Sequence, residues 1–395
     1  MGLRSLVSSI YVEPIMFIYM ICLYYLIPAT SSLYMYKVCR TVHNYSTDLC
    51  RDLVNAKITA NNTAEEDVVS KGGSLWLFYQ TICFTIPSTI VTLLLGLYGD
   101  RKGRKIPMIL PCIGQGLGCL YYILMAKMDM LNVSYMVVGA FITGASGGFA
   151  SIIMASFSHL STTTSGADRT IRIVILQCIM GVGTALGSFT VGSLVNTPDD
   201  PIGGWVRTFG MITGLSMLCI VYILIRFHSP PRLHRSYDDI SSSAAPSADP
   251  QGFASRINIV KVLSTVCQGF PSVLQLTLAA IWFAWVTGLG EFDVLFTYTQ
   301  RMGLDRSIYG YYTGYGAIVQ AIAGAVSVLL FKRFLDMSDS VLALIGLFSA
   351  CLELLFLGLS GFFGGSSVVR IYVLFSKLYA AKERHVKLAD VIILA

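Results

Sequence analysis

The chain has 395 residues, of which 54% are hydrophobic and only 13% are charged, and its formal net charge is +6. Soluble domains carry about 25% charged residues, so this composition excludes a water-soluble globular protein. The basic residues gather in particular loops, where they indicate orientation in a membrane and not nucleic-acid binding. No nucleophile, metal-ligand or phosphate-binding pattern stands out, so we expect neither an enzyme nor a bound metal or cofactor.

Apolar stretches of about 20 residues, the length that crosses ~30 Å of hydrocarbon, follow one another along most of the chain. Lipid offers no partners to backbone N–H and C=O groups, so each stretch is predicted to be an α-helix. The sequence therefore predicts an all-α polytopic membrane protein with about ten spans. They cover residues 12–36, 74–98, 106–126, 133–157, 171–194, 209–225, 276–298, 308–331, 341–359 and 362–379.

A polar stretch at residues 228–272 divides these spans into two groups. Its middle is rich in serine, alanine and proline, which is typical of a flexible linker. We therefore expect a first membrane bundle of six helices at residues 1–227 and a second bundle at residues 273–395. About four spans fit the second bundle, so we expect the chain to be truncated at its C-terminus relative to two complete six-helix bundles.

The basic loops follow the second, fourth, sixth and eighth predicted spans, which places all of them on one side of the membrane. By the positive-inside rule this side is cytoplasmic, and the N-terminus lies on the same side. The first outer loop is then the long segment at residues 37–73. It contains Cys39 and Cys50, and we expect a disulfide between them because the outer compartment is oxidising. Glycosylation sequons that fall on the outer side begin at Asn44, Asn61 and Asn132.

The most specific pattern lies between the second and third predicted spans, where Gly96 to Lys105 read GLYGDRKGRK. It resembles the major facilitator signature G-x-x-x-D-[RK]-x-G-[RK]-[RK] at every defined position. Gly96 allows close helix approach and Gly103 permits a tight turn. Asp100 can pair with Arg104, and we expect a latch that breaks when two halves of a transporter rock. The alternative is that the cations only set topology. The motif residues are Gly96, Asp100, Arg101, Gly103, Arg104 and Lys105.

Wider stretches of the chain resemble the proton-coupled folate transporter family, solute carrier family 46, within the major facilitator superfamily. The similarity is carried by VEPIMFIYM near the N-terminus, by GDRKGRK, by GGFASIIMASFSHL followed by Arg169 and Arg172, and by IYGYYTGYGA. The resemblance implies two six-helix-type bundles, the second of them incomplete here, with the substrate site between them near the bilayer midplane. It also implies proton-driven symport of bulky organic anions, such as folates, related heterocycles or peptidoglycan-derived compounds.

Several positions that the family uses for coupling differ in this chain. Gln177 aligns with an acidic residue of the fifth span, and Gly288 falls near a histidine of the seventh. Gly148 and Ala140 stand where the family has an aspartate and an arginine in the fourth span. The family's outer-loop cysteine pairs with one between the seventh and eighth spans, but residues 299–307 contain no cysteine. Proton coupling would therefore depend on other residues.

Intramembrane charges in the second half supply candidates, because charged groups in lipid are costly and mark functional sites by default. Glu291 and Asp293 lie two residues apart in the seventh span and therefore on different faces of the helix. Either could carry a proton in the cavity, or both could be hydrated at the outer interface. Asp293 also matches an aspartate of the family and is the first choice. Arg370 resembles the family's arginine in the tenth span, where it would attract an anionic substrate.

These features predict a multi-pass secondary active transporter that couples uptake of an organic anion to protons by alternating access. A proton-independent facilitator or exporter of another small molecule is one alternative, because a fold does not determine its substrate. A truncated membrane protein that does not transport is the other. The plasma membrane is favoured over lysosomal or endosomal membranes. The expected partners are the lipid bilayer, protons and an organic anion, without nucleic acid, and the oligomeric state is left open.

Overall fold

The computed structural model describes residues 11–55, 63–164, 166–195 and 201–226, together with residue 310, residues 313–319 and residue 322. Every regular element in these ranges is helical, as predicted for an all-α membrane protein. Six described segments are long and apolar enough to cross a membrane, which agrees with the six spans predicted before residue 228. These segments are Glu13–Val42, Ala64–Asp100, Lys105–Lys127, Val133–Thr163, Arg172–Val191 and Pro201–Arg226.

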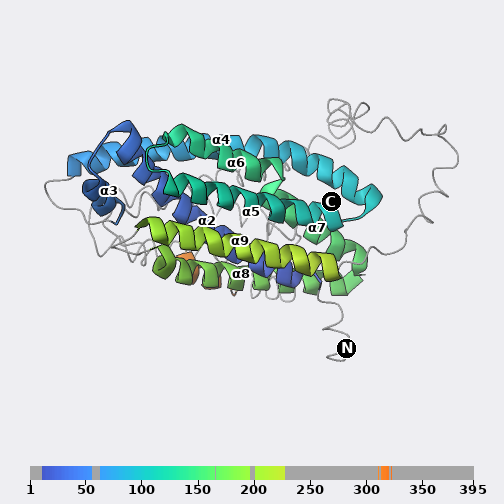
Figure 1. The fold of residues 1–395 in the computed structure, drawn as a ribbon. Helices are drawn as coiled ribbons and strands as arrows, with labels where there is room; N and C mark the ends of the chain where they lie inside the picture. Colours follow the sequence, from blue (N-terminus) through green and yellow to red (C-terminus); the bar gives the residue numbers. More distant parts are fainter. Residues whose placement is uncertain are drawn as a thin grey trace, which may run out of the picture. The chain divides into compact units, whose positions relative to one another are not determined.

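Figure 1 shows how these helices run alongside one another. A π-helical turn at Val38–Val42 extends the first long helix, and a 3₁₀ turn at Val133–Tyr135 leads into α6. The α-helices in chain order are α2 (Glu13–Lys37), α3 (Thr47–Val54), α4 (Thr63–Lys102), α5 (Lys105–Lys127), α6 (Met136–Ala145), α7 (Gly148–Thr163), α8 (Gly166–Val195) and α9 (Pro201–Arg226).

Helix α2 packs against both α8 and α9, and α9 packs in turn against α5. Two glycines on α8 explain the close approach to α2. A Cβ atom at Gly183 would lie 2.7 Å from the carbonyl oxygen of Phe17, and one at Gly187 would lie 3.1 Å from that of Ile21. Any larger residue would push the two backbones apart, so these glycines serve the helix packing expected of small residues in membrane bundles.

Polar side chains inside this bundle are paired between helices. The indole N–H of Trp205 on α9 donates to the hydroxyl oxygen of Ser32 on α2 over 2.7 Å. The hydroxyl groups of Tyr25 on α2 and Thr190 on α8 lie 2.8 Å apart. Because lipid cannot replace such partners, these bonds favour one arrangement of α2, α8 and α9.

Helix α4 lies along α6 and α7 and is the least buried of the six spans. Its outer face exposes large apolar side chains, which suits contact with lipid and not with water. These side chains include Leu75, Phe78, Ile86 and Leu93. The helix has 40 residues. At 1.5 Å per residue it is about 60 Å long, so it extends beyond the hydrocarbon layer.

Several boundaries and one loop differ from the sequence prediction, and the largest boundary shifts are at the starts of the second and sixth spans. The second span begins earlier than expected, at Ala64, because α4 already includes the acidic residues Glu65 and Glu66 in its first turn. The sixth span also begins earlier, at Pro201, since proline is favoured in the first turn of a helix. The segment at residues 37–73 was expected to be a loop, yet its described part is mostly helical.

The fourth span was expected to be a single helix and is instead two, α6 and α7. The chain breaks at Gly147 and Gly148, whose φ angles are +89° and +51°. L side chains rarely adopt this left-handed region, so the glycine pair permits the break. Hydropathy did not reveal it, because glycine is also common inside continuous membrane helices.

The predicted linker at residues 228–272 and the predicted spans at residues 276–298, 341–359 and 362–379 lie outside the described residues. The described residues of the eighth predicted span are helical and adjoin α8. A Cβ atom at Gly310 would lie 2.4 Å from the carbonyl oxygen of Ser188. Part of the second half therefore approaches the backbone of α8 as closely as α2 does.

Candidate functional site

The helical bundle has two polar ends. The motif end holds the turn between α4 and α5, and the disulfide end holds the Cys39–Cys50 bond. At the motif end, the backbone N–H of Gly103 donates to the carbonyl oxygen of Gly99 over 3.0 Å, and Gly103 has φ +98°. This left-handed residue reverses the chain within two positions, which is why the motif requires glycine here.

Arg104 is held mainly by α7. Its guanidinium donates hydrogen bonds to the carbonyl oxygen of Ser158 and to the hydroxyl oxygen of Thr162 in the last turns of that helix. The carboxylate of Asp100 is 3.9 Å away and 71% exposed, whereas Arg104 is 18% exposed. An exposed pair at this distance contributes little, while a cation at a helix C-terminus is favoured by the helix dipole.

The protonation state of Arg104 is not in question. Burial lowers the pKa of Arg104 from its usual value, and the charge of Asp100 acts in the opposite direction. A guanidinium nevertheless stays charged in proteins. Arg104 therefore presents a permanent cation to α7.

The other motif residues also contact neighbouring helices. A Cβ atom at Gly96 would lie 3.1 Å from the sulfur of Met154 on α7, so Gly96 allows α4 to approach α7. The ammonium of Lys105 donates to the carbonyl oxygen of Leu224 on α9 over 3.3 Å. Arg101 lies in the last turn of α4, and its side chain is outside the described part. The turn between α4 and α5 is thereby connected to both α7 and α9.

A buried ion pair at the motif end was not found by sequence reasoning. Glu13 on α2 is 4% exposed and lies 3.5 Å from the guanidinium of Arg172 on α8. The backbone N–H groups of Tyr11 and Val12 donate to the second carboxylate oxygen, each over 3.0 Å. These contacts connect the start of α2 to α8.

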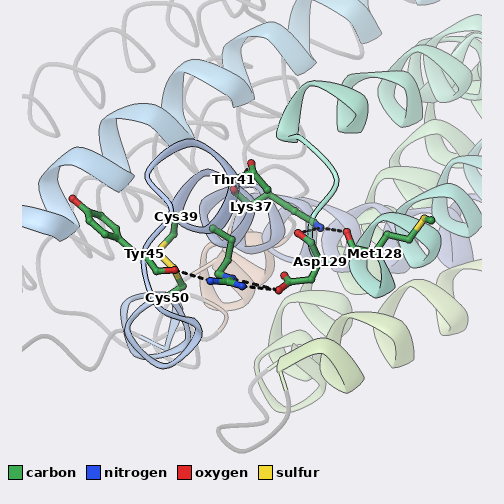
Figure 2. Close-up of polar contacts among 8 residues, drawn as sticks. Lys37, Cys39, Thr41, Tyr45, Cys50, Met128 and Asp129 are labelled. Atoms are coloured by element: carbon green, nitrogen blue, oxygen red, sulfur yellow. Dashed lines mark hydrogen bonds and ion pairs between the residues drawn. A yellow bond between two sulfur atoms is a disulfide. The ribbon is translucent and has the colours of Figure 1, made fainter.

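Lys37 at the disulfide end is fully buried, which is rare for a lysine. Figure 2 shows its ammonium directed at the connection that follows α5, where it donates to the carbonyl oxygens of Met128 and Asp129 over 2.5 and 3.0 Å. The ammonium thus satisfies carbonyls that the end of α5 leaves without helical partners. In the sequence, only the position of Lys37 at the end of an apolar span indicated that this lysine could be buried.

Arg40 completes the polar cluster of the disulfide end, and its partners Tyr45 and Asp129 are labelled in Figure 2. Its guanidinium donates from two nitrogens to one carboxylate oxygen of Asp129, over 3.2 and 3.3 Å, and from a third to the carbonyl oxygen of Tyr45 over 2.7 Å. A disulfide joins Cys39 to Cys50 beside it. The segment after α2 is therefore connected to the α5–α6 connection by charge and closed on itself covalently.

Two of the three sequons lie in the described part. Asn44 is exposed, with φ +54°, in the loop that the disulfide closes. Asn132 is also exposed, but its side-chain oxygen accepts hydrogen bonds from the backbone N–H and the hydroxyl of Ser134, over 3.0 and 2.8 Å. Asn61 lies outside the described residues.

The predicted proton and substrate residues are only partly placed. Gln177 lies on α8, and its side-chain nitrogen is buried without a hydrogen-bond partner. Glu291, Asp293 and Arg370 lie outside the described residues. In the part of the chain that the structure describes, no group of three or more His, Cys, Asp or Glu residues is arranged to hold a metal ion.

Comparison with known proteins identifies the class. The model of the Major Facilitator Superfamily matches residues 14–384, which is most of the chain, so the chain belongs to this superfamily. The D-xylose-proton symporter aligns over 98% of this chain and 82% of its own, with a TM-score of 0.54 and 11% identity. The xylose transporter XylE from E. coli aligns over 97% and 87%, with a TM-score of 0.57 and 13% identity. At these identities the structures show the fold alone.

Relatives confirm the resemblance to solute carrier family 46. The chain is 24% identical over 287 residues to the proton-coupled folate transporter of Bos taurus, covering 69% of this chain and 60% of the relative. It is 25% identical over 291 residues to the bovine lysosomal proton-coupled steroid conjugate and bile acid symporter SLC46A3, covering 73% of this chain and 57% of the relative. The chain thus spans less than two thirds of the length of these relatives.

Proposed function

We propose that this chain is a secondary active transporter that carries an organic anion together with protons by alternating access. The observation that carries the proposal is the similarity to two transporters that share the description proton-coupled, one of folate and one of steroid conjugates and bile acids. Folates and bile acids are both bulky organic anions. The superfamily plan places the substrate between two bundles, here residues 1–227 and 273–395, joined by the linker at residues 228–272.

The motif end supports the conformational part of this proposal. Hydrogen bonds from Arg104 to α7 can break one at a time, as a reversible latch requires. Helix α8 contacts α2 on one side and Gly310 and Gly314 of the second half on another. Movement between the halves would therefore act on α8 directly. In this proposal the motif end is cytoplasmic, because the basic loops gather there.

Proton coupling in this chain would not use the fifth span. Gln177 has an amide that cannot carry a proton at physiological pH, although its buried nitrogen is free to donate a hydrogen bond to a substrate oxygen. We assign proton transfer to Asp293 first and Glu291 second, and anion attraction to Arg370. A specific observation favours a second candidate, a proton-independent facilitator: the described spans contain Gln177 where the family has an acid.

Uptake assays separate these functions. Radiolabelled folate, a steroid sulfate and a muramyl peptide would be supplied at pH 5.5 and pH 7.4 to cells expressing the chain, beside Asp293→Asn. Uptake that is enhanced by acid and lost in the variant supports proton-coupled transport. Uptake that is the same at both pH values supports the proton-independent facilitator. No uptake of any probe, with the protein present at the cell surface, contradicts the proposal for these substrates.

Surface labelling also tests the expected plasma membrane location against the lysosomal location that the name of the SLC46A3 symporter gives.

A further inference from the structure

The break between α6 and α7 lies about halfway along the fourth span, which runs from Val133 to Thr163. The backbone N–H of Gly147 donates to the carbonyl oxygen of Gly144 over 2.8 Å and closes α6. The N–H of Ser151 donates to the carbonyl oxygen of Gly147 over 3.2 Å and opens α7. The two helices therefore share a junction that no continuous ladder of backbone hydrogen bonds stiffens.

Helix α4 offers this junction two hydroxyl donors one turn apart. Ser88 donates to the carbonyl oxygen of Gly147 over 2.9 Å, and the hydroxyl of Thr92 lies 3.3 Å from the same oxygen. The Thr92 hydroxyl also lies 2.7 Å from that of Ser151. A carbonyl with a second donor available four residues along α4 can exchange partners without becoming unsatisfied. Such exchange removes the main cost of moving a polar group inside a membrane.

The glycines at the junction leave no room for side chains. A Cβ atom at Gly144 would lie 2.4 Å from the carbonyl oxygen of Phe84, and one at Gly148 would lie 2.7 Å from the ring of Phe84. Gly147 and Gly148 also have positive φ angles. A glycine pair tolerates changes of φ and ψ that other residues resist, which is the property of a hinge.

The far end of α7 is the part that holds Arg104, through Ser158 and Thr162. Helix α7 has 16 residues. A rigid helix of this length is about 24 Å long, so a tilt of about 10° at its start moves its end by about 4 Å. That displacement is enough to break a hydrogen bond.

We propose that Gly147 and Gly148 form a hinge at which α7 tilts against α4 and α6, and that this tilt releases Arg104 at the motif end. In this movement the carbonyl oxygen of Gly147 shifts along α4 and accepts a hydrogen bond first from one and then from the other of the hydroxyl groups of Ser88 and Thr92. The inference rests on the proposed alternating-access function and assigns part of its movement to a bend within one bundle, in addition to rocking between the two.

Distances between spin labels test the hinge without a substrate. One pair, Ile106→Cys with Thr163→Cys, joins the start of α5 to the end of α7, where both native side chains are exposed. A reference pair, Leu124→Cys with Val138→Cys, joins α5 to α6 at the other end. The full chain, with its accessible native cysteines replaced, is measured in liposomes at pH 5.5 and pH 7.4. We expect two distances for the first pair and one for the reference pair.

Variants at the junction should change the populations of the two distances. Gly148→Ala should leave one distance, while Gly210→Ala, on α9 with nothing near the added methyl, should retain two. If Gly148→Ala does not fold, Ser88→Ala and Thr92→Val test the same point without backbone strain. Each should change the population ratio about threefold, the effect of one membrane hydrogen bond of roughly 0.6 kcal/mol. Thr89→Val is their control, because the hydroxyl of Thr89 bonds only within α4, to Thr85.

One outcome overturns the hinge: a single distance for the α5–α7 pair that neither pH nor any junction variant changes. Two distances that respond to the junction variants support it. This result is independent of flux, so a chain that bends but takes up none of the probes would contradict the proposed substrates and coupling and leave the hinge in place. A chain that transports these probes while the α5–α7 pair shows a single unchanging distance would contradict the hinge and leave the proposed function in place.

Discussion

The two ends of the described bundle hold their charges in different ways. At the disulfide end, Lys37 is fully buried and Arg40 bonds Asp129 with two nitrogens, beside a covalent bond between cysteines. At the motif end, Arg104 bonds acceptors on α7, and its acidic neighbour Asp100 is 71% exposed. The first set of contacts cannot change without a large loss of stability, whereas the second can be exchanged one bond at a time. The disulfide end is thus held covalently and by buried charge, whereas the contacts of Arg104 at the motif end are hydrogen bonds.

The largest effect is expected from the disulfide. Cys50→Ser opens a loop whose ends are 11 residues apart. It should lower the free energy of unfolding by about 3 kcal/mol, because the unfolded chain gains loop entropy. Thermal unfolding of the purified protein in detergent measures the change. Cys83→Ser, at a partly buried free cysteine, is the control. Equal losses in both variants would contradict a special role for the disulfide end.

The next effect is expected from the charge pair at the same end. Asp129→Asn removes the charge that Arg40 bonds with two nitrogens, at a site where both side chains are mostly buried. We expect the free energy of unfolding to fall by about 1 to 2 kcal/mol, because the guanidinium of Arg40 would then bond a neutral amide oxygen and not a carboxylate. The same unfolding assay applies, with Asp52→Asn on α3 as the matched control. A loss no larger than that of the control would show that the pair is dispensable.

A smaller effect on stability, but a clear one on conformation, is expected at the motif end. Arg104→Lys keeps the charge and loses the planar fork that reaches Ser158 and Thr162 together. The free energy of unfolding should fall by less than about 1 kcal/mol. The released state of the α5–α7 spin-label pair should become more populated. Lys102→Arg, at an exposed neighbour, should change neither quantity. If Arg104→Lys destabilised the protein as much as Cys50→Ser, the contrast between the two ends would be wrong.

The smallest effect on stability is expected from Asn44. Its exposed side chain in the disulfide-closed loop should carry a glycan, so Asn44→Gln should increase electrophoretic mobility with little change in unfolding. Asn132→Gln serves as the comparison, because its side-chain oxygen is used by Ser134. Treatment with an endoglycosidase that leaves the wild-type mobility unchanged would contradict glycosylation, and with it the support for an outward-facing disulfide end.

Sequence reasoning was reliable where apolar length or one required residue type decided the outcome. Six spans in the described part were predicted because apolar length alone decides whether a helix can cross a membrane. The turn at Gly103 was predicted because only glycine adopts its backbone conformation without strain. The break at Gly147 was missed, since a glycine pair has the same composition in a continuous helix and in a broken one. The early start of α4 was missed because its first turn is acidic.

The sequence by itself determined that the chain is a membrane protein of many helices, which six segments before residue 228 are long and apolar enough to cross a membrane, and where the motif turn lies. Only the tertiary structure decided that Arg104 is held mainly by α7, that Glu13 meets Arg172 from 159 positions away, and that Lys37 reaches the end of α5. The physical reason is that hydropathy and backbone preference are properties of neighbouring residues. The partner of a buried charge depends instead on which helices pack side by side, and on which faces.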